Sequence, residues 1–357
     1  MVDSPALRPA QWLIPRASTF VFNHVQLGLA VYAATKDLPR GALLLLAFEF
    51  GIFGDSILRV GAVWQWAIAG MGAAIMLIIV DMRVAGPETL PLLVVSIGFI
   101  ALSLKKIRTA TDALGTIKRR WRNYGYLSAG LFSLEGAASL VFLMMLIAIF
   151  GRVGGSTDRN LRSPISKGMH LRVSYAAIFL HHLHYFSYTY LVVIILIKRF
   201  DVSALVIGPL FLVGWLGYYH FASAQRGLIG LIVAGHIAAS AAAFGLLSSS
   251  SLLLFLALWF VTGLGGGTII LLRNLITEAD PTVYDRFKFW EAVGHIAGLG
   301  VFCTAIYIQH YALAFTVALV SGLLCASAVL VVSVLSVREE RFGVRRAVAV
   351  DGSDGRT

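Results

Sequence analysis

Charged residues are scarce in this chain. They make up 13% of its 357 residues, whereas a typical soluble protein carries about 25%. The two cysteines, Cys303 and Cys325, each stand alone in an apolar stretch, so neither a disulfide framework nor a redox pair is indicated. No Walker motif for binding nucleotide phosphates is present, which argues against an ATP-driven machine. The scarcity of charge leaves apolar residues as the main component of the chain.

Hydrophobic residues make up 58% of the chain and are gathered into about eleven blocks. A helix needs roughly 20 apolar residues to cross a hydrocarbon layer of about 30 Å, and most blocks approach that length. The blocks are continuously apolar and lack the alternation of a membrane β-barrel. The sequence therefore predicts an all-α, multi-pass membrane protein with crossings at 18–35, 41–59, 62–80, 88–104, 124–150, 173–197, 203–220, 227–247, 250–272, 290–308 and 312–336.

The net charge of +11 indicates topology rather than a nucleic-acid partner, because the basic residues are dispersed into short segments between the blocks. Basic residues collect on the cytoplasmic side of membrane proteins. With the N-terminus inside, the first half has ten basic residues inside and three outside, and the second half prefers the same orientation. We expect a multi-pass protein of a bacterial plasma (inner) membrane, with the lipid bilayer as its surroundings.

A polar linker divides the chain into two similar halves. Phe22 to Gln26 opens the first helix of one half, and Leu180 to His184 occupies the comparable place in the other. Internal duplication of this kind is typical of transporters. The predicted parts are a cytoplasmic segment at 1–17, a half of about five helices at 18–150, the linker at 151–169, a half of six helices at 170–336, and a disordered tail at 337–357.

The apolar block at 124–150 conflicts with the charge count. The basic segment at 105–122 and the linker both favour the cytoplasm, yet this single block separates them. Its 27 residues are too few for two full spans. Three alternatives are open: the block dips and returns, the first half lacks a sixth helix, or the two halves have opposite orientations. We favour an incomplete first half of five helices.

The chain resembles the major facilitator superfamily over roughly residues 18–336. Members of that family have two helical halves joined by a cytoplasmic linker, with both termini in the cytoplasm. That family usually carries the motif Gly-x-x-x-Asp-Arg-x-Gly-Arg-Arg between its second and third helices. Gly51, Asp55 and Arg59 match it, whereas the other basic and glycine positions do not. The resemblance implies a bundle of two helical halves with a conformational latch at these three residues. The alternative is that Asp55 only marks the water interface at a helix end.

Carboxylates inside apolar blocks are candidates for function, because charge at membrane depth is costly. Glu49 and Glu135 each lie in mid-block and could exchange a proton with the cytoplasm or the outside. Glu291 and His295 lie four residues apart, so they share a helical face and could relay a proton. The alternatives are structural hydrogen bonds, misplaced helix ends and an interfacial polar pair. Two ligands alone do not make a metal site.

A run of histidines and tyrosines follows the linker. His181, His184 and Tyr188 fall on one helical stripe, and His182 turns to an adjoining face. The first helix of each half lines the central cavity in the resembled family, so these side chains would contact the solute or carry protons there. His24 would lie on the opposite wall. The alternative is that each histidine is simply hydrogen-bonded inside the bundle.

Other classes fit less well. Histidines are too scattered for a membrane di-iron desaturase, and copper would require clusters of Cys or Met that are missing. The glycine run at 263–268 lies inside a membrane block, which favours close helix packing over phosphate binding. We predict a secondary active transporter of a small organic solute, with proton-coupled efflux, no catalytic activity, and no cofactor or metal. The alternative is a non-transporting membrane protein, such as a haem-binding subunit, a membrane enzyme or an assembly factor.

Overall fold

The computed structural model describes residues 7–57, 63–82, 86–109, 115–150, 169–224, 229–279 and 284–351, and the regular structure in these ranges is helical. The first half contains α1 (Leu7–Thr35), α2 (Leu38–Ile57), α3 (Val63–Met82), α4 (Leu90–Thr109), α5 (Gly115–Leu127) and α6 (Leu134–Phe150). The second half contains α7 (Met169–Lys198), α8 (Ala204–Ala224), α9 (Ile229–Ser248), α10 (Leu252–Val261), α11 (Gly266–Ala279), α12 (Tyr284–Tyr307) and α13 (Tyr311–Asp351). Short 3-10 helices cover Pro87–Thr89 (η1), Ser128–Leu131 (η2) and Thr262–Gly265 (η3).

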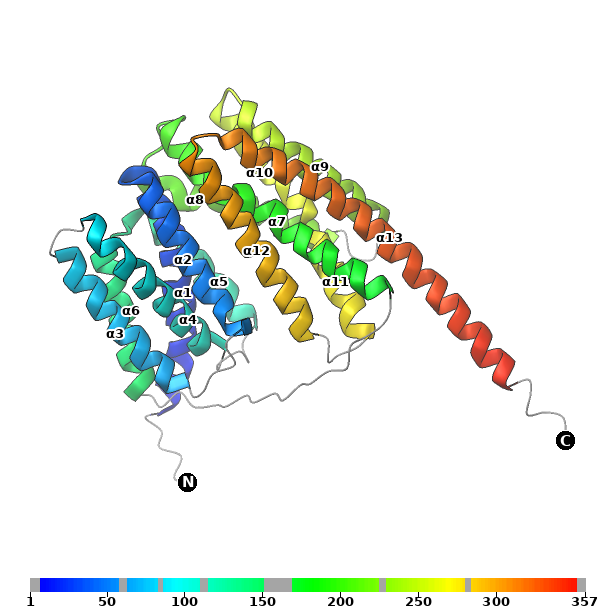
Figure 1. The fold of residues 1–357 in the computed structure, drawn as a ribbon, viewed down its shortest axis with the longest axis horizontal. Helices are drawn as coiled ribbons and strands as arrows, with labels where there is room; N and C mark the ends of the chain where they lie inside the picture. The colour runs from blue at the N-terminus through cyan, green and yellow to red at the C-terminus, as the bar shows by residue number, and fades with distance from the viewer. Residues whose placement is uncertain are drawn as a thin grey trace.

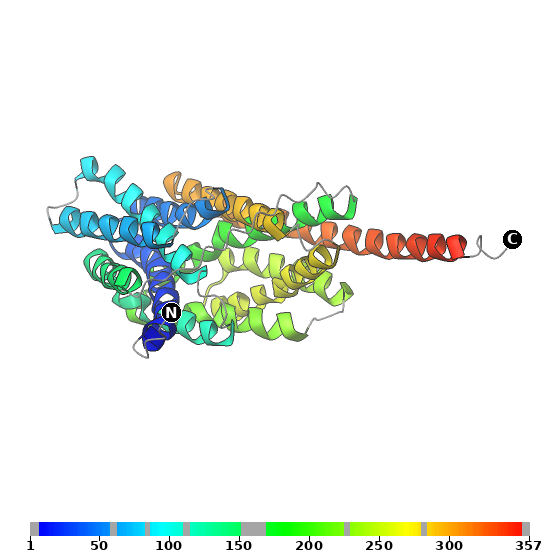
Figure 2. The same cartoon turned by 90° about the horizontal axis from the view of Figure 1, so that it is seen from below.

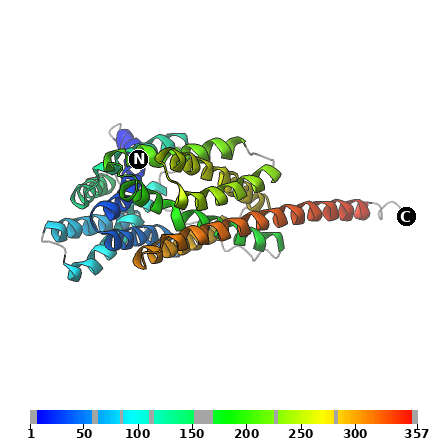
Figure 3. The same cartoon turned by 90° about the horizontal axis from the view of Figure 1, so that it is seen from above.

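The two halves lie side by side (Figure 1), and α10, η3 and α11 follow one another within one apolar stretch, Leu252–Arg273. Figures 2 and 3 show the same division from below and above, with α13 projecting beyond the bundle. The end of α6 and the start of α7 lie at the same end of the bundle as the start of α1, and we call this the linker end. The turns between α1 and α2 and between α12 and α13 lie at the opposite end.

The helices are suited to lipid. Within the described ranges, eight segments are long and apolar enough to cross a membrane: Val63–Val80, Pro87–Arg108, Leu171–Lys198, Ala204–Ala222, Ile229–Ser248, Leu252–Arg273, Arg286–Tyr307 and Tyr311–Leu335. Large apolar side chains also face outwards, and Phe150 and Leu253 are each 80% exposed. Such exposure would be costly in water and is favourable against lipid tails. The chain is a multi-pass integral membrane protein.

The block at 124–150 contains parts of two helices, which corrects the prediction of about five helices in the first half. α5 ends at Leu127, and η2 with the extended residue Phe132 makes the turn into α6. α5 escaped notice because it begins at Gly115, within the basic segment, where Lys and Arg hide a helix from a hydropathy pattern. With six helices among its described residues, the first half places both the basic segment and the linker at one end. The conflict in the charge count is thereby removed.

Both terminal segments are helical over part of their length. α1 begins at Leu7, so the segment at 1–17 is helical over most of its length. α13 continues to Asp351, so the predicted disordered tail is helical up to that residue. The sequence after Leu335 contains five Arg, two Glu and two Ala, and no proline. These residues favour a helix, and they extend the membrane span past the bundle (Figure 1).

Small residues set the spacing of the helices. A Cβ atom at Gly51 on α2 would collide with the carbonyl of Gly98 on α4. Gly263 in η3 lies equally close to the α8 backbone at Gly217 and Tyr218. Such contacts let helix backbones approach closely in a membrane. This geometry agrees with the interpretation of the glycine run as a packing feature.

A candidate solute cavity between the two halves

A cavity of about 720 Å³ lies between the two halves. This volume is within the range of roughly 300–1,000 Å³ that is usual for small-molecule sites. The first half contributes lining residues from α1, α2, α4 and α5, and the second half contributes them from α7, α8, α10, η3, α11 and α12. Its aromatic lining consists of Phe22, Phe53, Tyr185, Phe186, Trp215, Tyr218, Tyr219 and Trp259. Its charged lining, histidines apart, consists of Lys105, Arg108, Arg122, Arg273, Lys288, Glu49 and Glu291.

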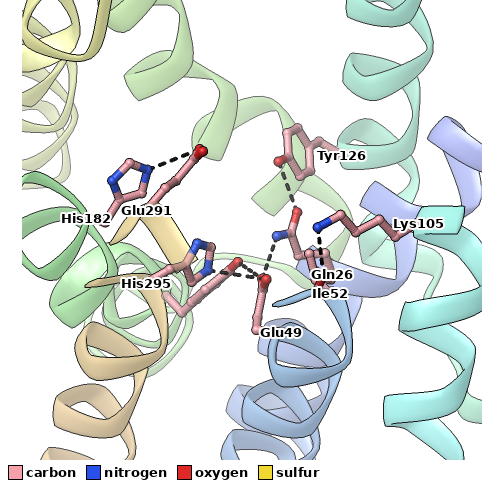
Figure 4. Close-up of polar contacts among 9 residues, drawn as sticks. Gln26, Glu49, Ile52, Lys105, Tyr126, His182, Glu291 and His295 are labelled. Atoms are coloured by element: carbon pink, nitrogen blue, oxygen red, sulfur yellow. Dashed lines mark hydrogen bonds and ion pairs between the residues drawn. The ribbon is translucent and has the colours of Figure 1, made fainter. Parts of the chain in front are cut away.

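Glu49 on α2 lies at the centre of a polar network that joins the two halves (Figure 4). Its side chain is fully buried. Glu49 Oε1 accepts hydrogen bonds from Gln26 Nε2 on α1 at 2.5 Å and from the Tyr190 hydroxyl on α7 at 2.6 Å. The Tyr126 hydroxyl on α5 donates in turn to Gln26 Oε1 at 3.2 Å. One oxygen of this buried carboxylate thus accepts a hydrogen bond from each half.

His295 on α12 makes a second link across the halves. Its Nε2 atom lies 3.3 Å from Glu49 Oε2, although the two atoms are not aligned for a hydrogen bond. The imidazole stacks on Phe186 and packs against Phe53. These rings fix a buried base beside a buried acid. The contact is sensitive to whether a proton is present on Glu49 or His295.

Glu291 and His182 form another acid and base pair at the cavity wall (Figure 4). Glu291 Oε2 accepts from Lys288 Nζ at 2.6 Å, and Glu291 Oε1 lies 3.4 Å from His182 Nε2. His182 Nδ1 lies 3.0 Å from the Ile178 carbonyl oxygen, which can only accept, so this nitrogen carries a hydrogen. The pair links α7 to α12 within the second half.

The described lining is electropositive. Five basic side chains oppose two carboxylates, which leaves an excess of three positive charges when the histidines are neutral. Aromatic rings hold some of the basic groups in place: Arg108 lies 4.4 Å from the Phe22 ring centre, and Arg122 lies 4.9 Å from that of Tyr219. A cleft lined mainly by one sign of charge concentrates the opposite ion. Among the described side chains, the lining therefore carries more positive than negative groups.

The two ends of the bundle differ around the cavity. Its basic lining extends to the linker end, where Arg108 lies in the last turn of α4 and Lys288 in the early part of α12. Towards the opposite end the halves are in contact, since the Cys303 thiol of α12 donates to the Ala42 carbonyl of α2 at 3.4 Å. The basic lining thus lies on the linker side of the contact between Cys303 and Ala42.

The structure brings five of the predicted pathway residues to the cavity. Glu49, His181, His182, Glu291 and His295 all line it. The face of α7 that meets the cavity nevertheless differs from the predicted stripe. The lining residues of α7 continue from the first two histidines to Tyr185, Phe186 and Thr189. Sequence spacing defines a stripe but does not fix which stripe faces the other half.

The remaining predicted residues lie elsewhere. His184 and Tyr188 are fully buried in the second half and are not part of the described lining. His24 Nδ1 lies 2.8 Å from the Ser128 hydroxyl, within the first half. Glu135 is exposed in the first turn of α6 instead of lying in the middle of a span, because the turn after Leu131 had not been anticipated.

Only part of the predicted latch can be placed. Gly51 makes the close contact between α2 and α4 noted above. The side chain of Asp55 and the whole of Arg59 lie outside the described residues. The latch stays a prediction.

Several residues of the cavity and of the network around Glu49 were missed by sequence reasoning. Tyr126 and Tyr190 are polar aromatics inside apolar blocks, which is a signal that could have drawn attention to them. Lys105, Arg108 and Arg122 had been interpreted only as markers of topology. Lys105 and Arg108 lie on α4, and Arg122 lies on α5. The place of Arg122 in the cavity could not be inferred without knowing that α5 begins before the apolar block.

No protein-family model and no curated protein matches the chain in sequence. Solved structures do match it over nearly its whole length. A mutant of the nucleoside transporter NupG aligns with a TM-score of 0.60 at 12% identity, covering 91% of this chain and 99% of that one. A bacterial homologue of the iron transporter ferroportin, in an inward-facing state, gives 0.60 at 16% identity over 93% and 100% of the two chains. A bacterial homologue of the human lysosomal transporter Spinster, inward-facing and occupied, gives 0.61 at 11% identity over 91% and 97%.

The fold and cavity define a class: a membrane protein of two helical halves with a polar chamber between them. The chain shares its fold with these solved transporter structures. At these low identities the likeness concerns the fold. What the chamber accepts has to be argued from its own side chains.

Proposed function

We propose that this protein is a secondary active transporter that moves a small organic anion by alternating access between its two halves. The observation that carries the proposal is the cavity between the halves with its excess of basic side chains. Sites at the interface of two repeats are typical of transporters with this architecture. We place the protein in a bacterial plasma membrane, in line with the sequence-based expectation.

The lining supports an anion with an aromatic or otherwise apolar body. Trp215, Trp259 and Tyr218 offer flat apolar surface, and the guanidinium groups of Arg122 and Arg273 offer donors for a carboxylate, sulfonate or phosphate group. The structural neighbours are named as transporters of different cargoes, among them a nucleoside and iron. They therefore do not indicate the substrate class. We infer that class from the charge of the cavity lining instead.

The shape of the cavity supports an inward-facing state. The basic residues place the linker end in the cytoplasm. The basic lining of the cavity lies towards that end, and the contact between Cys303 and Ala42 lies towards the other. Alternating access would separate the halves at the opposite end and bring them together at the linker end.

Glu49 is the best candidate for coupling transport to protons. Protonation removes the charge that accepts from Tyr190 and faces His295, so it weakens the links between the halves. It also makes the cavity more positive by one charge, which strengthens the binding of an anion. Proton and anion would then bind cooperatively, which favours symport. The efflux by antiport expected from the sequence would instead suit a solute that competes with the proton.

Binding of matched aromatic ions tests the substrate class. Benzenesulfonate and benzyltrimethylammonium are similar in size and opposite in charge, and the cavity tryptophans provide a fluorescence signal. We expect purified protein to bind the sulfonate and to bind it more tightly as the pH falls. Reconstituted vesicles should take it up faster under an inward proton gradient. Preferential binding of the cation would overturn the assignment of an organic anion.

Glu49→Gln separates the role of this residue from other titrating groups. The variant imitates the protonated side chain, so sulfonate binding should lose its pH dependence and remain at the low-pH level. Glu135→Gln is the matched control, because Glu135 is exposed at the start of α6 and should leave binding unchanged. A pH dependence that persists in Glu49→Gln would contradict proton coupling through Glu49.

The non-transporting alternative of a haem-binding subunit has little support from the histidines. Both ring nitrogens of His182 are engaged, one with the Ile178 carbonyl and one with Glu291. His24 contacts Ser128 in the first half. A stoichiometric haem absorbance band in the purified protein would nevertheless favour that alternative over a carrier.

A further inference from the structure

A second polar group lies behind the cavity wall, inside the second half. His181 on α7, His236 on α9 and Cys325 on α13 each offer one ligand atom, and the three atoms lie within 4.8 Å of one another. His181 is 4% exposed, and the other two side chains are fully buried. Residues far apart in the sequence are thus assembled into one compact set of nitrogen and sulfur donors.

The polar atoms of this cluster are not satisfied by the protein. His181 Nδ1 and His236 Nε2 are buried and have no hydrogen-bond partner among the described residues. A buried polar atom without a partner costs roughly 1–3 kcal/mol. The Cys325 thiol donates to the Ala177 carbonyl at 3.3 Å, so its sulfur lone pairs stay available. Buried nitrogen and sulfur donors are therefore gathered at one point.

Surrounding contacts orient the histidines as metal ligands are usually oriented. His236 Nδ1 lies 3.3 Å from the Thr268 hydroxyl, which leaves Nε2 to face the cluster. His184 Nδ1 lies 2.7 Å from the Ala318 carbonyl oxygen and must donate to it. His184 Nε2 then has a bare lone pair, is buried and has no partner among the described residues. Metal-bound histidines characteristically use their second nitrogen in this way.

Close backbone contacts make room for the cluster. A Cβ atom at Gly322 on α13 would collide with the Ser240 hydroxyl and crowd His184. A Cβ atom at Gly265 in η3 would crowd His236 and the Tyr185 hydroxyl. Glycine at these two positions lets α13 and η3 approach the imidazoles.

We propose that His181, His236 and Cys325 bind one thiophilic d10 cation, Zn²⁺ or Cu⁺, with His184 as the fourth ligand. Imidazole and thiolate donors suit these ions, whereas Mg²⁺ and Ca²⁺ prefer oxygen. Bond lengths of about 2.0–2.1 Å to nitrogen and about 2.3 Å to sulfur require the donor atoms of His181, His236 and Cys325, which lie within 4.8 Å of one another, to move together by about 1 Å. Binding converts the Cys325 thiol to a thiolate and releases its proton to solvent.

The ion is a resident of the protein rather than its cargo. All four ligands belong to the second half, so the ion ties α7, α9 and α13 together and does not contact the first half. A cargo site in this fold lies between the halves, where alternating access exposes it to each side in turn. Only His181 lines the central cavity, which makes this imidazole the point of entry from solvent.

Metal titration of the purified full-length protein tests the proposal. Zn²⁺ is added against a chromophoric chelator, and Cu⁺ is added under reducing conditions against a copper(I) chelator, so the two arms distinguish the ions. We expect one ion per chain, with release of one proton, for at least one of them. Co²⁺ in place of Zn²⁺ should give a thiolate-to-metal charge-transfer band.

Variants assign the ligands. Cys325→Ser and His236→Gln should weaken binding at least about 100-fold and abolish the charge-transfer band. Cys303→Ser is the matched control, because this cysteine lies on α12 at the seam with α2 and should leave binding unchanged. Failure of wild-type protein to bind either ion would overturn the proposal by itself, as would binding that survives in a well-folded Cys325→Ser protein.

Discussion

The hydrogen bond from Tyr190 to Glu49 should hold the halves in the observed conformation. It joins α7 of one half to α2 of the other. Tyr190→Phe removes the hydroxyl while keeping the ring. A hydrogen bond to a charged group contributes about 1.5–3 kcal/mol. This bond would break when the halves separate at the opposite end. Tyr190→Phe should therefore shift the conformational equilibrium by roughly 10-fold to more than 100-fold towards the state open at that end.

Distances between spin labels at the opposite end measure that shift. Lys36 follows α1 and His310 precedes α13, and both side chains are exposed, so labelled cysteines at these positions report the separation of the halves. Cys303 and Cys325 are replaced by serine in this background. We expect Tyr190→Phe to increase the population of long distances, and the effect should shrink when benzenesulfonate stabilises the closed end.

Tyr188→Phe is the control for this experiment. Tyr188 lies on the same helix and is fully buried, but its hydroxyl has no hydrogen-bond partner among the described residues. The same chemical change should therefore leave the distance distribution as in the parent protein. An equal response of both variants, or no response to Tyr190→Phe, would show that the bond to Glu49 does not govern the opening.

Two further changes probe packing and charge. Gly322→Ala should lower the free energy of unfolding by about 1–3 kcal/mol in thermal denaturation, since its Cβ would collide with the Ser240 hydroxyl, whereas Gly300→Ala meets open space and should have little effect. Arg122→Gln should raise the KM for benzenesulfonate about tenfold with a small change in kcat, because it removes a donor and one positive charge from the cavity. Arg120→Gln is its control, since Arg120 is exposed and lies outside the described lining; equal effects of the two substitutions would contradict a direct role for Arg122.

The membrane helices could be predicted from sequence because their signal is one of composition. Blocks of apolar residues near span length fixed most elements of the second half within a few residues. α5 could not be found in this way, because a helix that lines a polar chamber and carries Arg120 and Arg122 does not resemble a lipid-facing span. Hydropathy identifies helices that face lipid. It does not identify a helix that faces water or the other half of the protein.

The candidate site could be predicted only in part. Glu49 and His295 were identifiable because charge and imidazole are rare in apolar blocks, yet their contact depends on how α2 meets α12. Tyr190 and His236 gain their importance from partners in other helices. Likewise, Cys325 looked isolated because the sequence does not show that α13 packs against α7 and α9. Contacts between distant segments are decided by packing, which periodicity within one helix does not encode.

The cluster of histidines with Cys325 and the network around Glu49 meet in one helix. α7 carries His181 and His184 in its middle and Tyr190 two turns further on. An ion bound to α7, α9 and α13 would stiffen the second half as a unit, whereas the bond from Tyr190 links that unit to the first half. Alternating access requires halves that move as rigid bodies against each other. Loss of the ion should therefore reduce the cooperativity of opening without changing the charge of the cavity, so transport would slow while the affinity for the anion stayed the same.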